Sequence, residues 1–172
     1  MARKLSVKWK ILAFIVPVFI VIDQWTKVLV IEHFYVGKSV PILDGFFHLT
    51  YVRNKGAAFG FLADAHSAFR IPFFVVVPLV ALGVIGYLFR ALKGEDRLMA
   101  TALSLVLSGA IGNLIDRIRL GYVVDFLDFF WGVYHYPAFN VADSAICVGV
   151  GLMMWDLFKK KNITEASRTM GA

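Results

Sequence analysis

The chain contains a single cysteine, Cys147, among its 172 residues. One cysteine excludes an internal disulfide and any cysteine-based metal cluster. Because Cys147 lies inside an apolar run, we expect a buried structural side chain and not a reactive thiol. The four histidines, at positions 33, 48, 66 and 135, lack the His-Glu-x-x-His spacing of zinc proteases. The sequence therefore predicts no metal site and no cofactor.

The sequence also lacks repeats, low-complexity tracts and linkers, so we expect one domain over residues 1–172. Hydrophobic residues make up 59% of the chain, and its mean hydropathy is +0.73. This composition is too apolar for an ordinary soluble domain and indicates an integral membrane protein. The net charge of +6 does not predict a nucleic-acid partner, because the basic residues cluster at the ends of apolar runs.

Four segments are long and apolar enough to cross a bilayer core, which takes about 20 helical residues. They cover approximately residues 11–31, 71–89, 98–115 and 138–158. The first is interpreted as a retained helix and not as a secretory signal, because no cleavage site of the Ala-x-Ala type follows it. The sequence therefore predicts an all-α membrane protein with four transmembrane helices.

Lysine and arginine gather at both termini and between the second and third spans. These segments hold more than half of the 18 basic residues, namely Arg3, Lys4, Lys8, Lys10, Arg90, Lys93, Arg97, Lys159, Lys160, Lys161 and Arg168. Basic segments stay on the cytoplasmic side of a membrane. We therefore expect both termini in the cytoplasm, and two loops, approximately 32–70 and 116–137, on the outer side.

The two outer loops have distinct compositions. Residues 46–53 are aromatic and β-prone, and the turn signal Asn54-Lys55-Gly56 follows them, which predicts a small hairpin or curved sheet, a cradle at the outer interface. The second loop is rich in aromatic side chains, which favour the level of the lipid headgroups. We expect it to be an aromatic interfacial loop, containing Phe126, Phe129, Phe130, Trp131, Tyr134 and Tyr136.

Two aspartates, Asp125 and Asp143, lie where a membrane protein tolerates them poorly, because an ionised carboxylate in hydrocarbon costs about 2.5–3.5 kcal/mol. A rise of about 1.5 Å per residue places Asp143 about 7–8 Å below the outer face. Asp23 and Asn113 reach the same outer third of the membrane from other spans. Two aspartates that meet there would share one proton and could activate water against a peptide carbonyl.

Other interpretations of these polar residues stay open. The two aspartates could cap helices, or could pair with Arg117 or Arg119. Asp23 and Lys27 are four residues apart and could form an ion pair inside the bundle. Asp116 and Arg117 could form an ordinary interfacial pair at the end of the third span, although a site role is favoured for the arginine.

Asp128 is interpreted as a solvated loop charge outside the site. For the chain as a whole, two other functional classes also stay open. Buried acids also build proton relays, so a small proton-coupled transporter or channel subunit is the alternative function. Transporters often carry inverted repeats with sites at the bilayer midplane, whereas these acids lie toward the outer face. In a non-enzymatic scaffold, the third possibility, the intramembrane acids would be a needless cost.

Five segments, taken together and in this order, resemble the lipoprotein signal peptidases, also called signal peptidase II. Each segment is weak evidence alone, but the set is specific in a four-span chain of this size. The segments are Asp23-Gln24-Trp25-Thr26-Lys27, Asn54-Lys55-Gly56-Ala57-Ala58-Phe59-Gly60, Gly109-Ala110-Ile111-Gly112-Asn113-Leu114-Ile115-Asp116-Arg117, Val124-Asp125-Phe126, and Phe139-Asn140-Val141-Ala142-Asp143-Ser144.

The resemblance implies a multi-pass aspartic endopeptidase of the bacterial cytoplasmic (inner) membrane, with its active site toward the periplasmic face. Such enzymes remove the signal peptide from diacylglyceryl-modified prolipoproteins, cut just before the lipidated cysteine, and are the target of globomycin. We expect this chain to act as a monomer. By the same resemblance, Asp125 and Asp143 would be the catalytic dyad. The residues that shape the site or hold the substrate would be Asp23, Asn54, Gly56, Asn113, Arg117 and Asn140.

Overall fold

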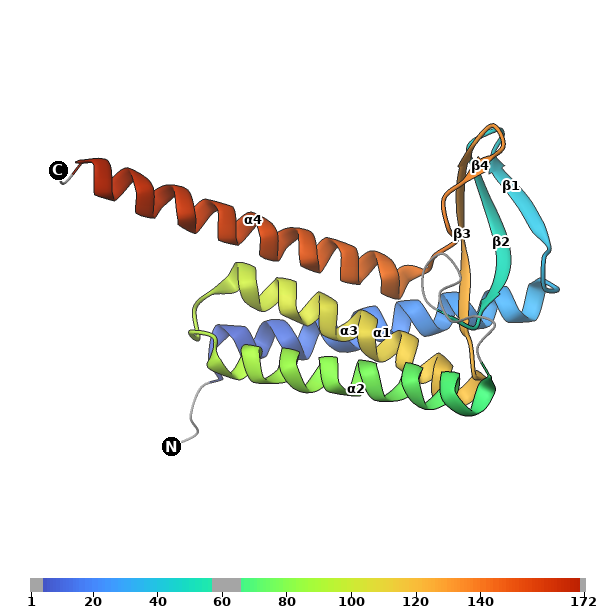
Figure 1. The fold of residues 1–172 in the computed structure, drawn as a ribbon, viewed down its shortest axis with the longest axis horizontal. Coiled ribbons are helices and arrows are strands. Elements are labelled where there is room, and N and C mark those ends of the chain that lie inside the picture. The colour runs from blue at the N-terminus through green and yellow to red at the C-terminus, as the bar shows by residue number, and fades with distance from the viewer. Residues whose placement is uncertain (1–4, 57–65, 171–172) are drawn as a thin grey trace.

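The computed structural model describes residues 5–56 and 66–170. Figure 1 shows its helices side by side, with a small sheet across one end of them. The start of the first helix and the end of the last one lie at the opposite end. The elements are α1 (Val7–His33), β1 (Ser39–Leu43), β2 (Phe47–Asn54), α2 (Ser67–Ala91), α3 (Arg97–Leu120), β3 (Val123–Trp131), β4 (Tyr134–His135) and α4 (Val141–Met170).

All four helices are long and apolar enough to cross a membrane. Together with the small sheet, they confirm the fold class expected from the sequence. Large apolar side chains on the outside of the bundle stay exposed, including Phe14 of α1, Val80 of α2 and Leu157 of α4. Such exposure would be unfavourable in water, and lipid is the solvent that suits it.

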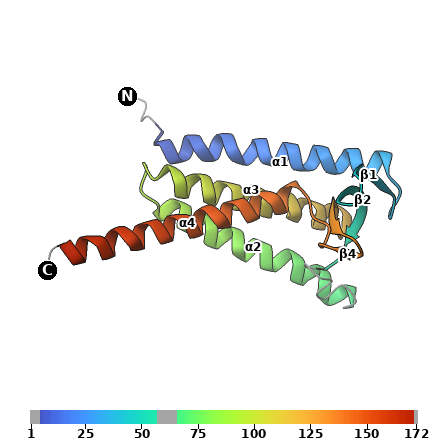
Figure 2. The ribbon, with the colours of Figure 1, turned by 90° about the horizontal axis from the view of Figure 1, so that it is seen from above.

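The central helix is α3, which packs against α1, α2 and α4 (Figure 2). Two of its glycines permit close approach. A Cβ atom on Gly109 would collide with the carbonyl oxygen of Ala142 in α4, and one on Gly112 would lie 2.6 Å from Oδ2 of Asp23 in α1. Small residues allow membrane helices to pack closely. These two glycines therefore bring α1 and α4 close to α3.

The sheet has the order β1-β2-β3-β4, with antiparallel neighbours. Residues 47–54 form a strand as expected, but its hairpin partner is the preceding strand β1. The return of the chain expected after the turn at Asn54-Lys55-Gly56 lies outside the described residues. The expectation of an aromatic loop at 126–136 is wrong in one respect, because most of that segment forms β3 and β4. Aromatic residues suit strands as well as headgroups, and composition alone does not separate the two. Pairing with β2 places Val52 opposite Asp125.

The second outer loop starts later than expected. It was expected at residues 116–137, but α3 continues to Leu120 and ends where Gly121 adopts a left-handed conformation with φ +76°. Glycine pays no Cβ penalty there, which makes it a common residue after a helix end. Asp116 and Arg117 therefore lie inside the helix, where their side chains point in different directions.

A small buried cluster fixes β3 on the C-terminal end of α1. It consists of Val30 from α1, Tyr51 from β2, and Val124 and Phe126 from β3. Successive side chains of a strand point to opposite faces. Because Asp125 stands between Val124 and Phe126, packing of these two residues against α1 turns the aspartate toward the other face of the sheet.

Candidate active site

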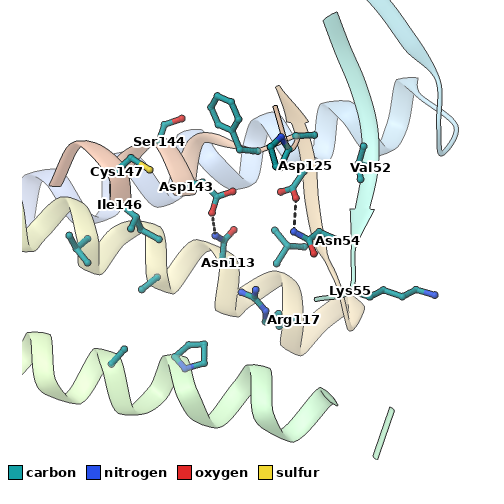
Figure 3. Close-up of a pocket in the computed structure, with 18 of the residues that line it drawn as sticks. Val52, Asn54, Lys55, Asn113, Arg117, Asp125, Asp143, Ser144, Ile146 and Cys147 are labelled. Atoms are coloured by element: carbon teal, nitrogen blue, oxygen red, sulfur yellow. Dashed lines mark hydrogen bonds between the residues drawn. The ribbon is translucent and has the colours of Figure 1, made fainter. Parts of the chain in front are cut away.

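A pocket of about 980 Å³ lies where the sheet meets α2, α3 and α4. Both aspartates expected to form the dyad line it. Figure 3 shows Asp125 entering the pocket from β3 and Asp143 entering it from the first turn of α4. Residues 18 positions apart in the chain therefore line one opening, because the strand and the helix both begin beside it.

Asp125 is almost completely buried, with 1% of its surface exposed. Its Oδ2 atom accepts a hydrogen bond from Asn54 Nδ2 at 3.0 Å, and its Oδ1 atom accepts one from Asn140 Nδ2 at 2.7 Å. Burial and, next, the negative charge of Asp143 raise the pKa of Asp125 to about 7, against the opposing effect of the two hydrogen bonds. This carboxyl group therefore keeps its proton into the neutral range.

Asp143 is half-buried and is the third residue of α4. Its backbone N–H donates to Asn140 Oδ1 at 2.9 Å, and its Oδ2 atom accepts from the N–H of Asn140 at 3.3 Å. This reciprocal arrangement is a capping box. Asn113 Nδ2 also donates to Asp143 Oδ1 at 2.7 Å. The capping role considered for Asp143 is thus present, and the same contacts orient its carboxylate at the pocket.

The amide of Asn54 is fixed by a neighbouring turn. The N–H of Gly56 donates to Asn54 Oδ1 at 3.0 Å, which leaves Nδ2 as the donor to Asp125. The rest of this motif, residues 57–60, lies outside the described residues. The third amide, that of Asn113, accepts through Oδ1 from Lys27 Nζ at 2.9 Å and from Asn140 Nδ2 at 3.2 Å.

Arg117 also lines the pocket, with its guanidinium 5.2 Å from the ring centroid of Phe74. Its neighbour Asp116 faces α1 and forms an ion pair with Lys27 at 2.9 Å. The interfacial Asp116–Arg117 pair, which the sequence left open as the less favoured alternative, is therefore not formed among the described residues, since adjacent helical residues do not face each other. Within the described residues, neither aspartate of the pocket forms an ion pair with Arg117 or Arg119.

Asp23 lies behind the pocket and does not line it. Only 1% of its surface is exposed, and it pairs with Lys27 at 2.9 Å, which confirms the intrahelical ion pair considered from the sequence. Its Oδ1 atom also accepts from the N–H of Ala142 at 2.9 Å. Asp23 therefore contacts the backbone at the start of α4 and not the pocket itself. The four-residue spacing to Lys27 predicted the pair but not this second contact.

Two expectations from the sequence are wrong. Asp128 is 7% exposed and accepts hydrogen bonds from Thr50 Oγ1 and from His135 Nδ1, each at 2.8 Å, so it is not a solvated charge. Cys147 is exposed and lines the pocket. It lies four residues after Asp143 and therefore on the same face of α4, a spacing that could have predicted its position.

The pocket has a polar and an apolar part. Away from the sheet it runs between α2, α3 and α4, where apolar side chains within the spans line it, including Val77, Ala81 and Ile85 of α2 and Val106 and Ala110 of α3. The carboxylates and amides lie at the end near the sheet (Figure 3). An apolar chain that enters from lipid could therefore present a polar bond to the two aspartates.

Comparison with known proteins agrees with this architecture. Residues 15–159 match the family model described as Signal peptidase (SPase) II. The chain is 56% identical over 142 residues to a lipoprotein signal peptidase of Geobacter sulfurreducens, covering 83% of this chain and 88% of that protein. It is 46% identical over 147 residues to a lipoprotein signal peptidase of Haemophilus influenzae, covering 84% of this chain and 85% of that protein.

A solved structure of a bacterial membrane enzyme, obtained by the in meso method at 2.3 Å resolution, has the same fold. It superposes with a TM-score of 0.76 at 33% sequence identity, covering 87% of this chain and 88% of that chain. The likeness of sequence and of fold thus extends over the spans, the sheet and the pocket, which together make up most of the chain. On these grounds the chain belongs to the signal peptidase II family, and it is a membrane-embedded peptidase.

Proposed function

We propose that the protein is an aspartic endopeptidase in which Asp125 and Asp143 together activate a water molecule. The observation that carries this proposal is that the two carboxyl groups, from β3 and α4, line one pocket. The pKa of Asp125, raised to about 7, lets the pair hold one proton at neutral pH. The two groups titrate as a unit, so neither is assigned a fixed role.

The reaction needs no metal and no covalent intermediate. The ionised member of the pair takes a proton from water as the water oxygen attacks the peptide carbonyl carbon, while the protonated member donates its proton to the carbonyl oxygen. The resulting diol then collapses, the C–N bond breaks, and the dyad passes a proton to the amine nitrogen. A diol hydroxyl returns a proton to the dyad. The pair ends with the single proton that it held at the start.

Three amides hold the pair in place during this exchange. Asn54 and Asn140 donate to Asp125, and Asn113 donates to Asp143. Arg117 lies on the pocket wall, where its positive charge can stabilise the partial negative charge on the carbonyl oxygen before that oxygen is fully protonated. Gly56 acts indirectly, because its backbone N–H sets the orientation of the Asn54 amide.

The substrate that we propose is a prolipoprotein whose cysteine carries a diacylglyceryl group, cut just before that cysteine. The lipoprotein signal peptidases among the relatives support this class of substrate. The apolar part of the pocket lies within the spans and suits a membrane-anchored chain. We place the enzyme in the bacterial cytoplasmic membrane, with the sheet on the outer side. A globomycin-type inhibitor would occupy the same pocket.

The peptidase relatives favour this function over a proton-coupled transporter or a scaffold. It can be tested with purified enzyme in detergent and a diacylglyceryl-modified prolipoprotein, with cleavage followed by gel shift and by the mass of the product. D125N and D143N should each abolish cleavage and still fold. D128N is the matched control, since Asp128 is a buried aspartate of the same strand that does not line the pocket. Full cleavage by D125N or D143N would overturn the dyad.

The same assay tests the substrate. The unmodified prolipoprotein should be cut at least about tenfold more slowly than the lipidated one, because removing remote binding contacts lowers the rate at the reacting bond. Globomycin should compete with the lipidated substrate. Equal rates for the two substrates would contradict the lipid requirement while leaving the aspartic mechanism intact.

A further inference from the structure

Each aspartate of the proposed dyad is preceded by a residue whose backbone amide is held by a buried carboxylate. Oδ2 of Asp116 accepts from the N–H of Val124 at 3.1 Å. Oδ1 of Asp23 accepts from the N–H of Ala142 at 2.9 Å. Asp116 belongs to α3 and Asp23 to α1, so two different helices hold the two backbone positions from which the dyad projects.

A single ammonium group joins these two carboxylates. Lys27 Nζ lies 2.9 Å from Asp23 Oδ2 and 2.9 Å from Asp116 Oδ2. The side chains of all three residues are at most 3% exposed. The amide of Gln24 adds a second link, with Nε2 at 3.1 Å from Asp23 Oδ2 and 2.9 Å from Asp116 Oδ1. We call Lys27, Asp23 and Asp116 the Lys27 cluster.

The Lys27 cluster reaches the dyad by a third route. Lys27 Nζ donates to Asn113 Oδ1 at 2.9 Å, and Asn113 Nδ2 donates to Asp143 Oδ1 at 2.7 Å. An ammonium has three donors and no acceptor, and here all three donors are used. If the Asn113 amide turned over, its NH₂ would face the ammonium and its oxygen would face the carboxylate. Lys27, together with Asn140 Nδ2, therefore fixes which end of the Asn113 amide faces Asp143.

We propose that Lys27 and Asp116 are positioning residues of the reaction. Their cluster sets the separation and orientation of the Asp125 and Asp143 carboxyl groups, without touching the substrate. The inference rests on the proposed aspartic mechanism. Removing Lys27 would leave two buried carboxylates without a counter-charge, and removing the carboxylate of Asp116 would leave the N–H of Val124 without its acceptor. Loss of that arrangement should impair the chemical step more than substrate binding, since an error of about 1 Å in a reacting group can cost about a hundredfold in rate.

The test compares variants of Asp116 and Lys27 in the cleavage assay, with kcat normalised to the folded fraction measured by size-exclusion chromatography. D116L, which cannot accept from Val124, should lower kcat about a hundredfold and leave KM within about twofold. D116N keeps an acceptor oxygen for the N–H of Val124, so its kcat should be about tenfold higher than that of D116L. K27M removes one of the two donors to Asn113 Oδ1 and the cation that joins Asp23 to Asp116, so it should also lower kcat. If D116L or K27M fails to fold, the kcat and KM of D116N carry the test.

A second readout separates positioning from general stability. A purely structural role lowers the amount of active enzyme and keeps the shape of the pH–rate profile, whereas a displaced dyad changes the profile. The matched control is K160M. Lys160 pairs with Asp156 at the same four-residue spacing, but in the half of α4 remote from the pocket, so its kcat should not change.

Two outcomes would overturn the inference. One is that D116L and K27M show the same kcat per folded molecule as the wild-type enzyme. The other is a loss of kcat with an unchanged pH–rate profile and with no recovery in D116N. D125N and D143N run in the same series separate this result from the proposed function. If they still cleave, the dyad itself fails. If they are inactive while D116L and K27M are normal, only the positioning role fails.

Discussion

The side-chain amide of Asn140 lies 2.7 Å from Oδ1 of Asp125. The same residue caps the helix that carries Asp143, because its Oδ1 atom accepts from the N–H of that aspartate at 2.9 Å. Asn140 is completely buried. One residue thus binds the strand aspartate through its donor end and positions the helix aspartate through its acceptor end, and these two roles can be separated by mutation.

Replacing Asn140 by alanine removes both roles and by serine only one. N140A should lose about 1 kcal/mol of stability through the missing cap and should also lose activity. N140S keeps a hydroxyl that can cap α4 but does not reach Asp125, so it should recover the stability and not the activity. Thermal unfolding in detergent and kcat for the two variants check this. Recovery of both properties in N140S would contradict a separate role at Asp125.

The pKa of Asp125 predicts a pH-dependent stability. It is raised from 3.8 to about 7 in the folded protein, so the folded state binds this proton more tightly than the unfolded chain does. The resulting contribution to stability is fully present below pH 3.8 and is lost as the pH rises through about 7. D125N does not titrate. Its Tm relative to wild type should therefore increase between pH 4 and pH 8, and parallel Tm curves would contradict the shift.

The apolar part of the pocket should be sensitive to its width. Ala81 of α2 lines the pocket, whereas the adjacent Val80 is 62% exposed and does not line it. A81F should place a ring in the path of the substrate and raise KM about tenfold or more, which corresponds to about 1.4 kcal/mol of lost binding. V80F is the control and should keep the wild-type KM. Equal KM values for both variants would show that substrate does not use this part of the pocket.

Close packing at Gly109 should be essential for the bundle. A Cβ atom there would collide with the carbonyl oxygen of Ala142, and backbone must then move. G109A should cost about 1–3 kcal/mol of stability and displace the start of α4. Gly86 of α2 has open space around its Cβ position, so G86A should be close to neutral. Thermal unfolding of the two variants in the same detergent compares them, and similar Tm values would contradict the tight α3–α4 contact.

The proposed orientation predicts which side of the membrane each turn occupies. Asp44 lies between β1 and β2, and Lys93 lies between α2 and α3, at opposite ends of the bundle. In a C147S background, D44C should react with an impermeant maleimide added outside intact cells, and K93C should react only after lysis. The reverse pattern would place the pocket on the cytoplasmic side.

The sequence predicts the spans well, because a bilayer demands long apolar helices and few other segments can satisfy it. The predicted span boundaries also place Asp125 and Asp143 at a similar depth in the membrane. The sequence does not predict β3, because that strand exists through pairing with β2, about 70 to 80 positions earlier in the chain. The alternation within β3 is masked by aromatic residues on both faces. For the same reason Asp128 is wrongly placed in solvent, since its partner Thr50 comes from β2.

Side-chain direction is the second element that sequence alone leaves open. The run that contains Cys147 is apolar, but a membrane helix has lipid, protein and pocket faces that can all be apolar. Asp116 and Arg117 are adjacent in sequence, and only the packing of α1 on α3 reveals that Lys27 is the partner of the aspartate. The positioning contacts therefore emerge from the arrangement of the helices and not from any local motif.

The amide of Ala142 is held by a carboxylate near the other end of the polypeptide, on α1. Because polypeptides are synthesised from the N-terminus, α1 with this carboxylate is inserted into the bilayer before α4, which carries Ala142. A nascent chain that stops before residue 141 already has the lysine and the strand acid but lacks the second acid. If Asp125 and Asp143 form the proposed dyad, hydrolysis would therefore become possible only once α4 has joined the bundle.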